Sequence, residues 1–242
     1  MTNHAERARS FGKQASSYER LRPAYPVAAI EVFLPGPGKR VVDVGAGTGK
    51  LTGVLARAGH AVIAVEPDPE MRATLVERLP EVDARAGAGE ALPVDDHSAD
   101  AITYAQSWHW VEQEAALREA RRVLTGDGVL ALLWNIPDTR QAWTKELHAI
   151  THPGWSVDEA EPMPLAGFGP GRLVRTPFRQ RLSPGEVVEL VGTHSEIATS
   201  TPDRRAAVLD AVRDLLATHP DVAGLAEVEL PYTCETYCYR PA

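Results

Sequence analysis

The chain has 242 residues, of which 44% are hydrophobic and 24% are charged, and it carries 25 Lys and Arg against 33 Asp and Glu. These values are typical of a globular protein and exclude a disordered or fibrous chain. The net charge of −8, without a run of Lys or Arg, argues against a nucleic-acid partner. No apolar run approaches the roughly 20 residues of a bilayer span, so we expect no membrane partner.

The N-terminus shows no charged-then-apolar signal pattern. An Arg-rich transit peptide over residues 1–26 is the alternative, and the acidic residues and prolines within that stretch argue against it. The two cysteines, Cys234 and Cys238, are four positions apart in a strand-like run, where about 13 Å would separate their Cα atoms. We therefore expect a reduced, cytoplasmic protein with buried thiols, and no metal site.

The first half of the chain alternates predicted strands and helices. Apolar, β-branched runs predict strands at 40–44, 61–66, 82–86, 100–106 and 128–134. Helical patterns lie between them at 51–58, from Asp68 to about Leu79, and at 112–124, and Asp68 and Pro69 form a typical helix start. This alternation predicts a parallel sheet with helices on both faces and a ligand site beyond the carboxyl ends of the strands.

The pattern changes after Pro137. We expect helices near 140–151, from the Ser183–Glu186 capping box to about Val191, and from Thr201 to about Thr218, followed by a strand over 227–240. The loop over 153–171 is rich in Pro and Gly and is a candidate hinge or lid. We expect a single domain over 1–242, with an N-terminal arm (1–35), a cofactor-binding core (36–136), and cap helices with late strands (137–242).

A glycine loop is the most informative motif. Gly45, Gly47 and Gly49 follow the strand at 40–44 and precede a helix, and Glu66 lies 21 residues after Gly45 at the end of the next strand. Glycines at such a turn let the backbone approach a ligand, and free N–H groups at the helix start attract an anion such as a phosphate or an amino-acid carboxylate. An acidic residue about 20 positions later can accept hydrogen bonds from a ribose.

Two related loops fit less well. The dinucleotide fingerprint GxGxxG requires glycine where this chain has Lys50, which argues against a nicotinamide cofactor. A P-loop requires glycine at the position of Val44 and Ser or Thr at the position of Leu51. A ribose-containing ligand without a pyrophosphate remains, and S-adenosylmethionine is the natural candidate.

Four successive segments carry a family resemblance: VVDVGAGTGKLT, VEPDPEM, GEALPVDDHSADAITYAQSWHWV and ALREARRVLTGDGVLALLWN. The chain resembles class I S-adenosylmethionine-dependent methyltransferases over residues 11–143, in the small-molecule branch that includes trans-aconitate methyltransferase-like proteins. The arm segment YERLRPAYP and the HW pair are shared with that branch. The resemblance implies a Rossmann-like α/β fold with a seven-stranded, mostly parallel sheet whose last strand is antiparallel.

The resemblance also implies how the cofactor is bound. The residues implied are Asp43, Gly45, Ala46, Gly47 and Gly49 around the methionine part, Glu66 on the ribose hydroxyls, Pro67 and Met71 against adenine, Gly89 and Glu90 at the adenine edge, and Gln106 and Ser107 beneath the sulfonium. The Asp that the family commonly has before the adenine-edge pair is Ala88 here.

The candidate acceptor residues come from three segments. They are Tyr18, Arg22 and Tyr25 of the arm, Trp108, His109 and Trp110 after the fourth strand, and Trp134 and Asn135 at the end of the fifth. A guanidinium can clamp a carboxylate, and His109 can accept a proton from a hydroxyl or hydrogen-bond a carboxylate. The alternative is that the tryptophans are packing residues, His109 is structural and the arm is a solvated helix face.

The sequence thus predicts an enzyme that methylates an oxygen, carboxylate or hydroxyl, of a small acidic or hydroxylated metabolite by in-line displacement. We expect a monomer or a homodimer. The alternatives are a non-catalytic sensor of S-adenosylmethionine or a nucleoside, and a nicotinamide oxidoreductase.

Overall fold

The protein folds around one mixed sheet of seven strands in the order β3-β2-β1-β4-β5-β7-β6. The computed structural model describes residues 20–154 and 161–242. The strands are β1 (Arg40–Val44), β2 (Ala61–Val65), β3 (Asp83–Arg85), β4 (Ala99–Ala105), β5 (Leu124–Pro137), β6 (Arg172–Leu182) and β7 (Val228–Tyr239). The first five pair in parallel, and β7 runs antiparallel to both β5 and β6. This confirms the predicted Rossmann-like fold, with the last strand antiparallel.

The helices are α3 (Val27–Glu31), α4 (Lys50–Arg57), α5 (Pro69–Arg78), the 3₁₀ helix η2 (Trp108–Trp110), α6 (Gln113–Val123), α7 (Ala142–Thr151), α8 (Pro184–Gly192), α9 (Ser195–Ala198) and α10 (Pro202–Thr218). The helices α5, α6, α8 and α10 begin at a residue whose side chain caps them. Asp68 accepts from two backbone amides at the start of α5, and Ser183 and Glu186 form the predicted capping box of α8. Gly59, with φ +85°, follows the end of α4.

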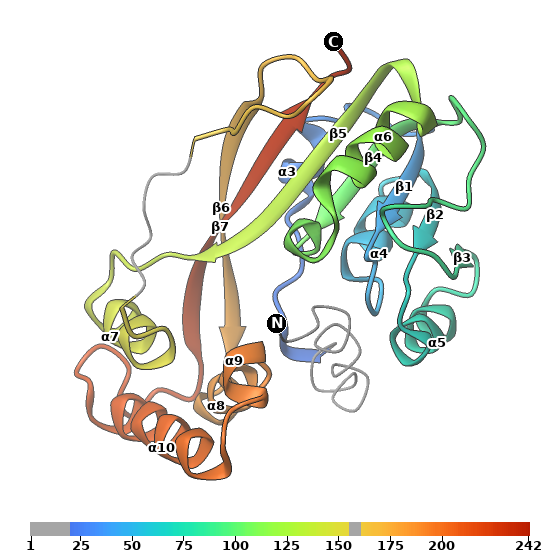
Figure 1. Ribbon diagram of the computed structural model, residues 1–242. Coiled ribbons are helices and arrows are strands. Elements are labelled where there is room, and N and C mark those ends of the chain that lie inside the picture. Colours follow the sequence, from blue (N-terminus) through green and yellow to red (C-terminus); the bar gives the residue numbers. More distant parts are fainter. Residues whose placement is uncertain (1–19, 155–160) are drawn as a thin grey trace.

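Helices cover both faces of the sheet. On one face, Ala116, Leu117 and Ala120 of α6 pack against β4, β5 and β7 in an apolar cluster. On the other face, α3 and α4 pack against β1 and β5 in a second cluster that includes Leu51 and Leu55. Figure 1 shows α6 in front of β4 and β5, and α3 behind them. Burial of both sheet faces explains the continuous apolar runs of the central strands.

The strand β6 was absent from the sequence prediction, which had a loop to 171 and then a helix. Four arginines, Arg172, Arg175, Arg179 and Arg181, occupy exposed positions of it at irregular spacing, and Pro177 lies in its middle. β6 is the edge strand beside β7, and exposed ion pairs such as Arg175–Glu235 line it. Charges and proline are tolerated at sheet edges and protect them from pairing with another strand. Because these residues interrupt the apolar pattern of a strand, β6 could not be predicted from hydrophobic periodicity.

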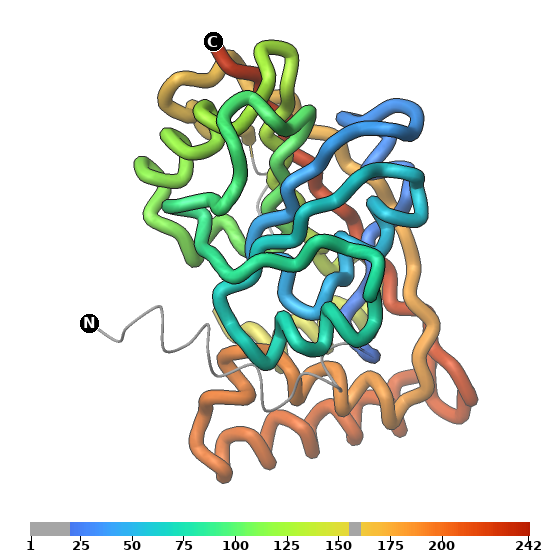
Figure 2. Tube along the Cα trace, turned by 90° about the vertical axis from the view of Figure 1, so that its right-hand side faces the viewer, coloured from blue at the N-terminus to red at the C-terminus, as the bar shows by residue number. Residues whose placement is uncertain are grey.

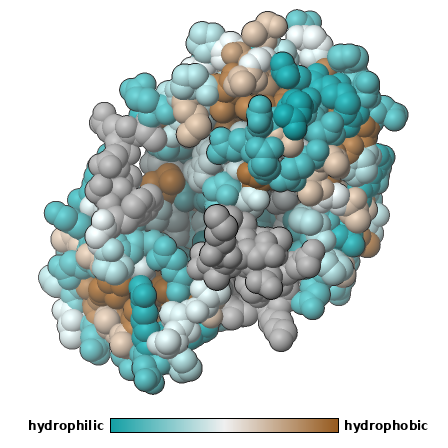
Figure 3. Space-filling model, viewed as in Figure 1, coloured by the Kyte–Doolittle hydropathy of each residue, from teal (hydrophilic) through white to brown (hydrophobic). Residues whose placement is uncertain are grey.

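The helices α7 to α10, here called the cap, lie at the carboxyl ends of the parallel strands. β5 leads into α7, and β6, which runs in the same direction as β5, leads into α8. The cap has an apolar cluster of its own, which includes Trp143, Leu190 and Leu216. Figures 1 and 2 show the cap below the sheet in two perpendicular views, and Figure 3 shows apolar side chains gathered over it at the lower left.

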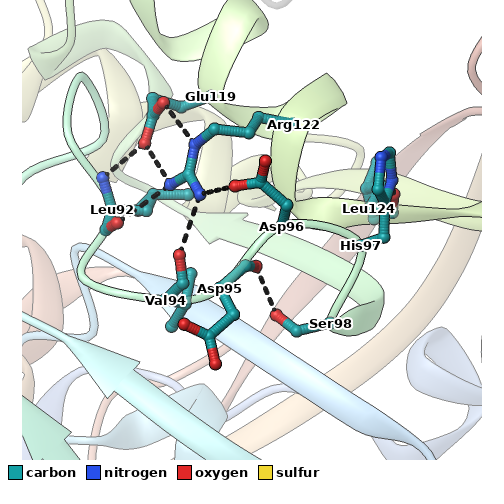
Figure 4. Close-up of polar contacts among 9 residues, drawn as sticks. All are labelled: Leu92, Val94, Asp95, Asp96, His97, Ser98, Glu119, Arg122 and Leu124. Carbon is teal, nitrogen blue, oxygen red and sulfur yellow. Dashed lines mark hydrogen bonds and ion pairs between the residues drawn. The ribbon is translucent and has the colours of Figure 1, made fainter.

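One arginine ties the loop before β4 to α6 (Figure 4). Arg122 pairs with Glu119 and Asp96 and donates to the carbonyl oxygens of Leu92 and Val94. Glu119 also accepts from the Leu92 amide at 2.8 Å. This network holds the segment that follows Gly89 and Glu90 against a helix of the core.

Other expectations concern loops, thiols and membrane helices. Residues 161–171 contain no helix or strand, as predicted, whereas 155–160 and the arm up to residue 19 lie outside the described residues.

Cys234 and Cys238 are free, and burial raises the pKa of Cys234 to about 12 and that of Cys238 to about 11. No helix within residues 20–154 and 161–242 is long and apolar enough to cross a bilayer.

Candidate active site

The glycine loop forms a tight turn between β1 and α4. Gly45, Gly47 and Gly49 all have left-handed backbone conformations, with φ of +66°, +58° and +86°. A Cβ atom at Gly45 would lie 2.6 Å from the Ser107 Cβ, whereas a Cβ at Gly47 would have nothing within 4 Å. The first glycine therefore allows close packing against β4, and open space lies beside the second.

The loop amides are mostly satisfied within the chain, which corrects the expectation of free donors for a ligand anion. The amides of Gly45 and Ala46 both donate to the Val65 carbonyl oxygen, at 2.8 and 3.2 Å, and the Gly49 amide donates to the Ala46 carbonyl oxygen at 2.9 Å. The Gly47 amide donates to Glu66 at 2.7 Å. These bonds fix the shape of the loop, and they leave little of its backbone for an anion.

Glu66 faces the loop from the end of β2. Its side chain is buried, and its two oxygens accept from the amides of Gly47 at 2.7 Å and Asp68 at 2.8 Å. Burial raises the pKa of Glu66, and the two amide hydrogen bonds oppose that shift. A carboxylate has about four acceptor positions, so two remain for hydroxyl groups of a ligand.

Asp43 lies beneath the loop and is fully enclosed. It accepts from the hydroxyls of Thr52 at 2.6 Å and Thr103 at 2.8 Å, and from the Thr52 amide in the first turn of α4. Burial raises its pKa to about 6, against its three hydrogen bonds. The anion at the start of this helix is thus supplied by the chain itself, and Asp43 supports the loop from below.

The strand ends β1, β4 and β5 are joined by polar side chains. Ser107 donates to the Val44 carbonyl oxygen at 2.7 Å, and the Gln106 amide group donates to the Asn135 carbonyl oxygen at 3.2 Å. Gln106 has φ +57°, a left-handed conformation that is uncommon outside glycine and clusters at functional sites. These residues place neutral groups beside the glycine loop at the carboxyl end of the sheet.

Comparisons with known proteins identify the family. A family described as a methyltransferase domain matches residues 42–132. An uncharacterized methyltransferase of Mycobacterium tuberculosis is 42% identical over 232 residues, which cover 96% of this chain and 94% of that protein. The chain is a class I S-adenosylmethionine-dependent methyltransferase.

Solved structures agree on the fold. A putative type II methyltransferase from Anaeromyxobacter dehalogenans has a TM-score of 0.66 at 20% identity, over 90% of this chain and 97% of that one. A Haemonchus contortus phosphoethanolamine N-methyltransferase in complex with S-adenosylhomocysteine has a TM-score of 0.55 at 12% identity, over 98% of this chain and 59% of that one. The match to the trans-aconitate branch stays a prediction.

The residues of the methyltransferase fit its cofactor, S-adenosylmethionine. Glu66 keeps two acceptor positions for the paired hydroxyls of a ribose, and open space lies beside Gly47, whose amide anchors that carboxylate. Met71, predicted to pack against adenine, is buried, whereas Pro67 is exposed. Gly89 is packed so closely that a Cβ would lie 2.9 Å from the Tyr104 hydroxyl. Glu90 accepts from the Glu112 amide at 2.7 Å and so holds the start of α6.

The aromatic residues after β4 divide between core and surface. Trp108 is buried and packs edge-to-face against Tyr104, with ring centroids 4.9 Å apart. His109 is exposed and lies against the half-buried Trp110, with ring centroids 4.6 Å apart. The structure thus favours the packing interpretation for Trp108, and the proposed roles of His109 and Trp110 stay predictions.

The arm and the end of β5 meet beside the cap. Asn135 donates to the carbonyl oxygens of Pro23 and Ala24, both at 3.4 Å, and Arg22 donates to the Thr193 carbonyl oxygen at 3.1 Å. Tyr25 is buried in the α3–α4 cluster, and Trp134 packs edge-to-face on Tyr237. Asn135 thus contacts the arm directly after Arg22, whose own side chain contacts the cap. Tyr25 and Trp134 serve in packing, and Tyr18 lies outside the described residues.

Three histidines in the cap were not among the residues predicted from the sequence. His148 of α7 and His152, the residue that follows α7, stack with ring centroids 5.0 Å apart, and the ring centroids of His152 and His194 are 5.3 Å apart. Two of them are four positions apart on a predicted helix, a spacing that places both on one face. The sequence therefore contained a signal for this pair. The proximity of His194 to the pair depends on how the segment after α8 packs against α7, which the sequence does not show.

Replacing Asp43 tests its position beneath the loop. Because its pKa is about 6 in the folded protein against an ordinary 3.8, the folded state binds the proton more tightly. Its contribution to stability is thus present below pH 4 and is lost as pH rises through about 6. We expect the free energy of unfolding of the wild type, minus that of Asp43→Asn, to fall by roughly 2.5 kcal/mol between pH 4 and 7, at about 1.4 kcal/mol per pKa unit.

Chemical denaturation of both proteins across this pH range measures the difference. A difference that stays constant would show that the pKa of Asp43 in the folded protein equals its ordinary value, and hence that its side chain is better solvated than the structure indicates. The wild type and Asp43→Asn must have the same m-value at each pH for their free energies of unfolding to be subtracted.

Proposed function

We propose that this methyltransferase transfers the methyl group to an oxygen of a small-molecule metabolite by in-line displacement, and that a carboxylate oxygen is the acceptor. One observation carries the proposal. The described side chains at the strand ends beside the glycine loop, Gln106, Ser107 and Asn135, are amides and a hydroxyl, which take up no proton at neutral pH. A carboxylate acceptor is already ionised and needs no base, whereas an alcohol or an ammonium group has to lose a proton.

The acidic groups nearest this point are engaged in other contacts. Asp43 is enclosed by two threonine hydroxyls, and Glu66 is held by the amides of Gly47 and Asp68. His109, the base candidate from the sequence, is exposed on η2. These contacts support an acceptor that brings its own negative charge.

The chain's residues then act by binding and orientation. S-adenosylmethionine supplies a methyl carbon on a positive sulfur, and an attacking oxygen forms the new bond while the carbon–sulfur electron pair stays with sulfur. Glu66 would hold the ribose, and Gln106 and Asn135 would orient the acceptor, since in-line displacement depends mainly on alignment. The arm residues 22–24, fixed between β5 and the cap, would restrict water from this side.

Product chemistry tests the proposal. The purified full-length chain is incubated with methyl-labelled S-adenosylmethionine and a panel of small carboxylic acids, alcohols and amines. We expect labelled product with carboxylic acids, and mild base should release the label as volatile methanol, because methyl esters hydrolyse and methyl ethers and methylamines do not. Glu66→Ala serves as the control for enzyme-dependent transfer.

A base-stable product would overturn the carboxylate assignment. Cofactor binding without turnover on any member of the panel would favour the sensor alternative. Neither outcome depends on where the groups of the acceptor that are not methylated bind.

A further inference from the structure

A narrow cleft in the cap lies outside the cofactor site. It is lined by His148 of α7, by His152 directly after α7, by His194, by Tyr232 of β7 and by apolar side chains of α8. Its free volume is about 40 Å³. A buried water needs roughly 10–15 Å³ on this measure, so the cleft holds a group of about three heavy atoms. A carboxylate has that size.

His194 supplies a buried donor or acceptor at this cleft. Among the residues that the structure describes, its Nδ1 atom is shielded from solvent and has no hydrogen-bond partner. An unsatisfied buried polar atom costs roughly 1–3 kcal/mol, and such atoms are rare in native proteins. A ligand that bonds to this nitrogen would remove that cost.

Arg22 does not line the cleft, but it brings a positive charge close to it, since this charge acts on His194, His152 and Tyr232. Its guanidinium donates to the carbonyl oxygen of Thr193, the residue before His194, and the arm is fixed on both sides of it. Gln180 donates to the Leu21 carbonyl oxygen at 2.7 Å, and Asn135 donates to the carbonyl oxygens of Pro23 and Ala24. These arm residues thus link the cap cleft to the end of β5 beside the cofactor site.

The electrostatics of the cluster favour an anion. Burial and then the charge of Arg22 lower the pKa of His194 well below its usual value. Burial also lowers the pKa of His152. The charge of His148 lowers the pKa of His152 further, and Glu196 of α9 opposes this shift. The remaining ionisable groups at the cleft are Tyr232 and Asp138, and Asp138 is paired with Arg140. An anion placed here would pair with the positive charge of Arg22 and would favour the protonated form of the imidazoles.

A metal site and a purely structural role fit these histidines less well. The group does not form a metal-ligating cluster within residues 20–154 and 161–242. His152 has a partner, since its Nδ1 lies 2.8 Å from the Thr151 hydroxyl, and the Nδ1 of His219, another buried cap histidine, accepts from the Asp221 amide at 3.2 Å. The Nδ1 of His194 has no such partner among the described residues.

We propose that Arg22, His152 and His194 form an anion-binding subsite that anchors a carboxylate of the methyl acceptor. This inference rests on the proposed function for the identity of the ligand, and the binding chemistry can be tested without turnover. Carboxylate and phosphate share the required charge and acceptor oxygens, and the free volume favours the smaller carboxylate.

The test follows histidine Cε1–Hε1 signals of the full-length chain by NMR during titration with sodium acetate or inorganic phosphate, with sodium chloride keeping ionic strength constant. We expect saturable shifts of the His152 and His194 signals with acetate in the roughly millimolar range. The apparent pKa of both should rise by about one unit at saturation, because the anion favours the imidazolium form. The exposed His109 should not respond.

Variants separate the subsite from general charge effects. Arg22→Gln should weaken acetate binding about tenfold or more, the scale of a lost charge-assisted hydrogen bond. Arg204→Gln, which removes an exposed charge elsewhere in the cap, should leave it unchanged. Arg22→Lys keeps the charge and should bind acetate with intermediate affinity. This variant keeps the test decisive if Arg22→Gln does not fold.

The outcomes are distinct from those of the methylation assay. Acetate shifts that do not saturate, or that are equal in wild type and Arg22→Gln, would overturn the subsite. Saturable binding of phosphate alone would overturn its assignment to a carboxylate. If acetate binds as expected and no base-labile product forms, the subsite stands and the proposed methylation of an acid fails.

Discussion

Glu66→Ala should weaken binding of S-adenosylmethionine by about 1.5–3 kcal/mol, or roughly 10- to 150-fold in Kd. The carboxylate has two acceptor positions that we propose for the ribose hydroxyls, and it also anchors the amides of Gly47 and Asp68. Its removal takes away the ligand contacts and leaves two amides without their partner. Isothermal titration calorimetry with S-adenosylmethionine or S-adenosylhomocysteine measures the change.

Two further variants define the cause of that loss. Glu66→Gln keeps the shape but turns an NH₂ group toward one of the two amide donors, so we expect a similar loss. Glu70→Ala removes an exposed carboxylate at the start of α5 and should leave the dissociation constant unchanged. An unchanged constant for Glu66→Ala would mean that the ribose is bound elsewhere.

Gly45→Ala should destabilise the fold and reduce cofactor binding together. The residue has φ +66°, and a Cβ there would lie 2.6 Å from the Ser107 Cβ. The left-handed conformation costs about 1–2 kcal/mol for a residue with a side chain, and overpacking adds roughly 1–3 kcal/mol. We therefore expect a loss of about 2–5 kcal/mol in the free energy of unfolding, measured by urea denaturation.

The neighbouring glycine provides a matched control. Gly47 has a similar φ of +58°, but a Cβ there meets nothing within 4 Å, so Gly47→Ala should show only the conformational cost. The double variant Gly45→Ala with Ser107→Gly removes the clashing Cβ and should recover part of the loss. Equal destabilisation by Gly45→Ala and Gly47→Ala would show that contact with Ser107 has no energetic weight.

Several features could be predicted from local sequence because they depend on neighbours in the chain. The capping box at Ser183 and the helix start at Asp68 are satisfied by backbone amides two or three residues away. The central strands follow from apolar runs that two covered sheet faces require. The exception is β6, whose arginines and Pro177 suit an edge and give no strand signal.

The candidate site was predicted in part for the same reason. Gly45, Gly47 and Glu66 are recognisable because a strand, a turn and the next strand place them within about 20 residues of each other. The sequence could not show that the loop amides are already bonded to Val65 and Glu66. Hydrogen bonds between separate strands depend on register, which a turn motif does not specify.

The sequence by itself thus determined the class of fold, the family and the cofactor, because periodicity, turn chemistry and the Gly45–Glu66 spacing act over short distances along the chain. Only the tertiary structure decided which side chains meet between the arm, the end of β5 and the cap. Arg22 and His194 are 172 positions apart, and they approach because the arm is fixed between β5 and the cap. Such contacts arise from the packing of a second apolar core, which no local pattern specifies.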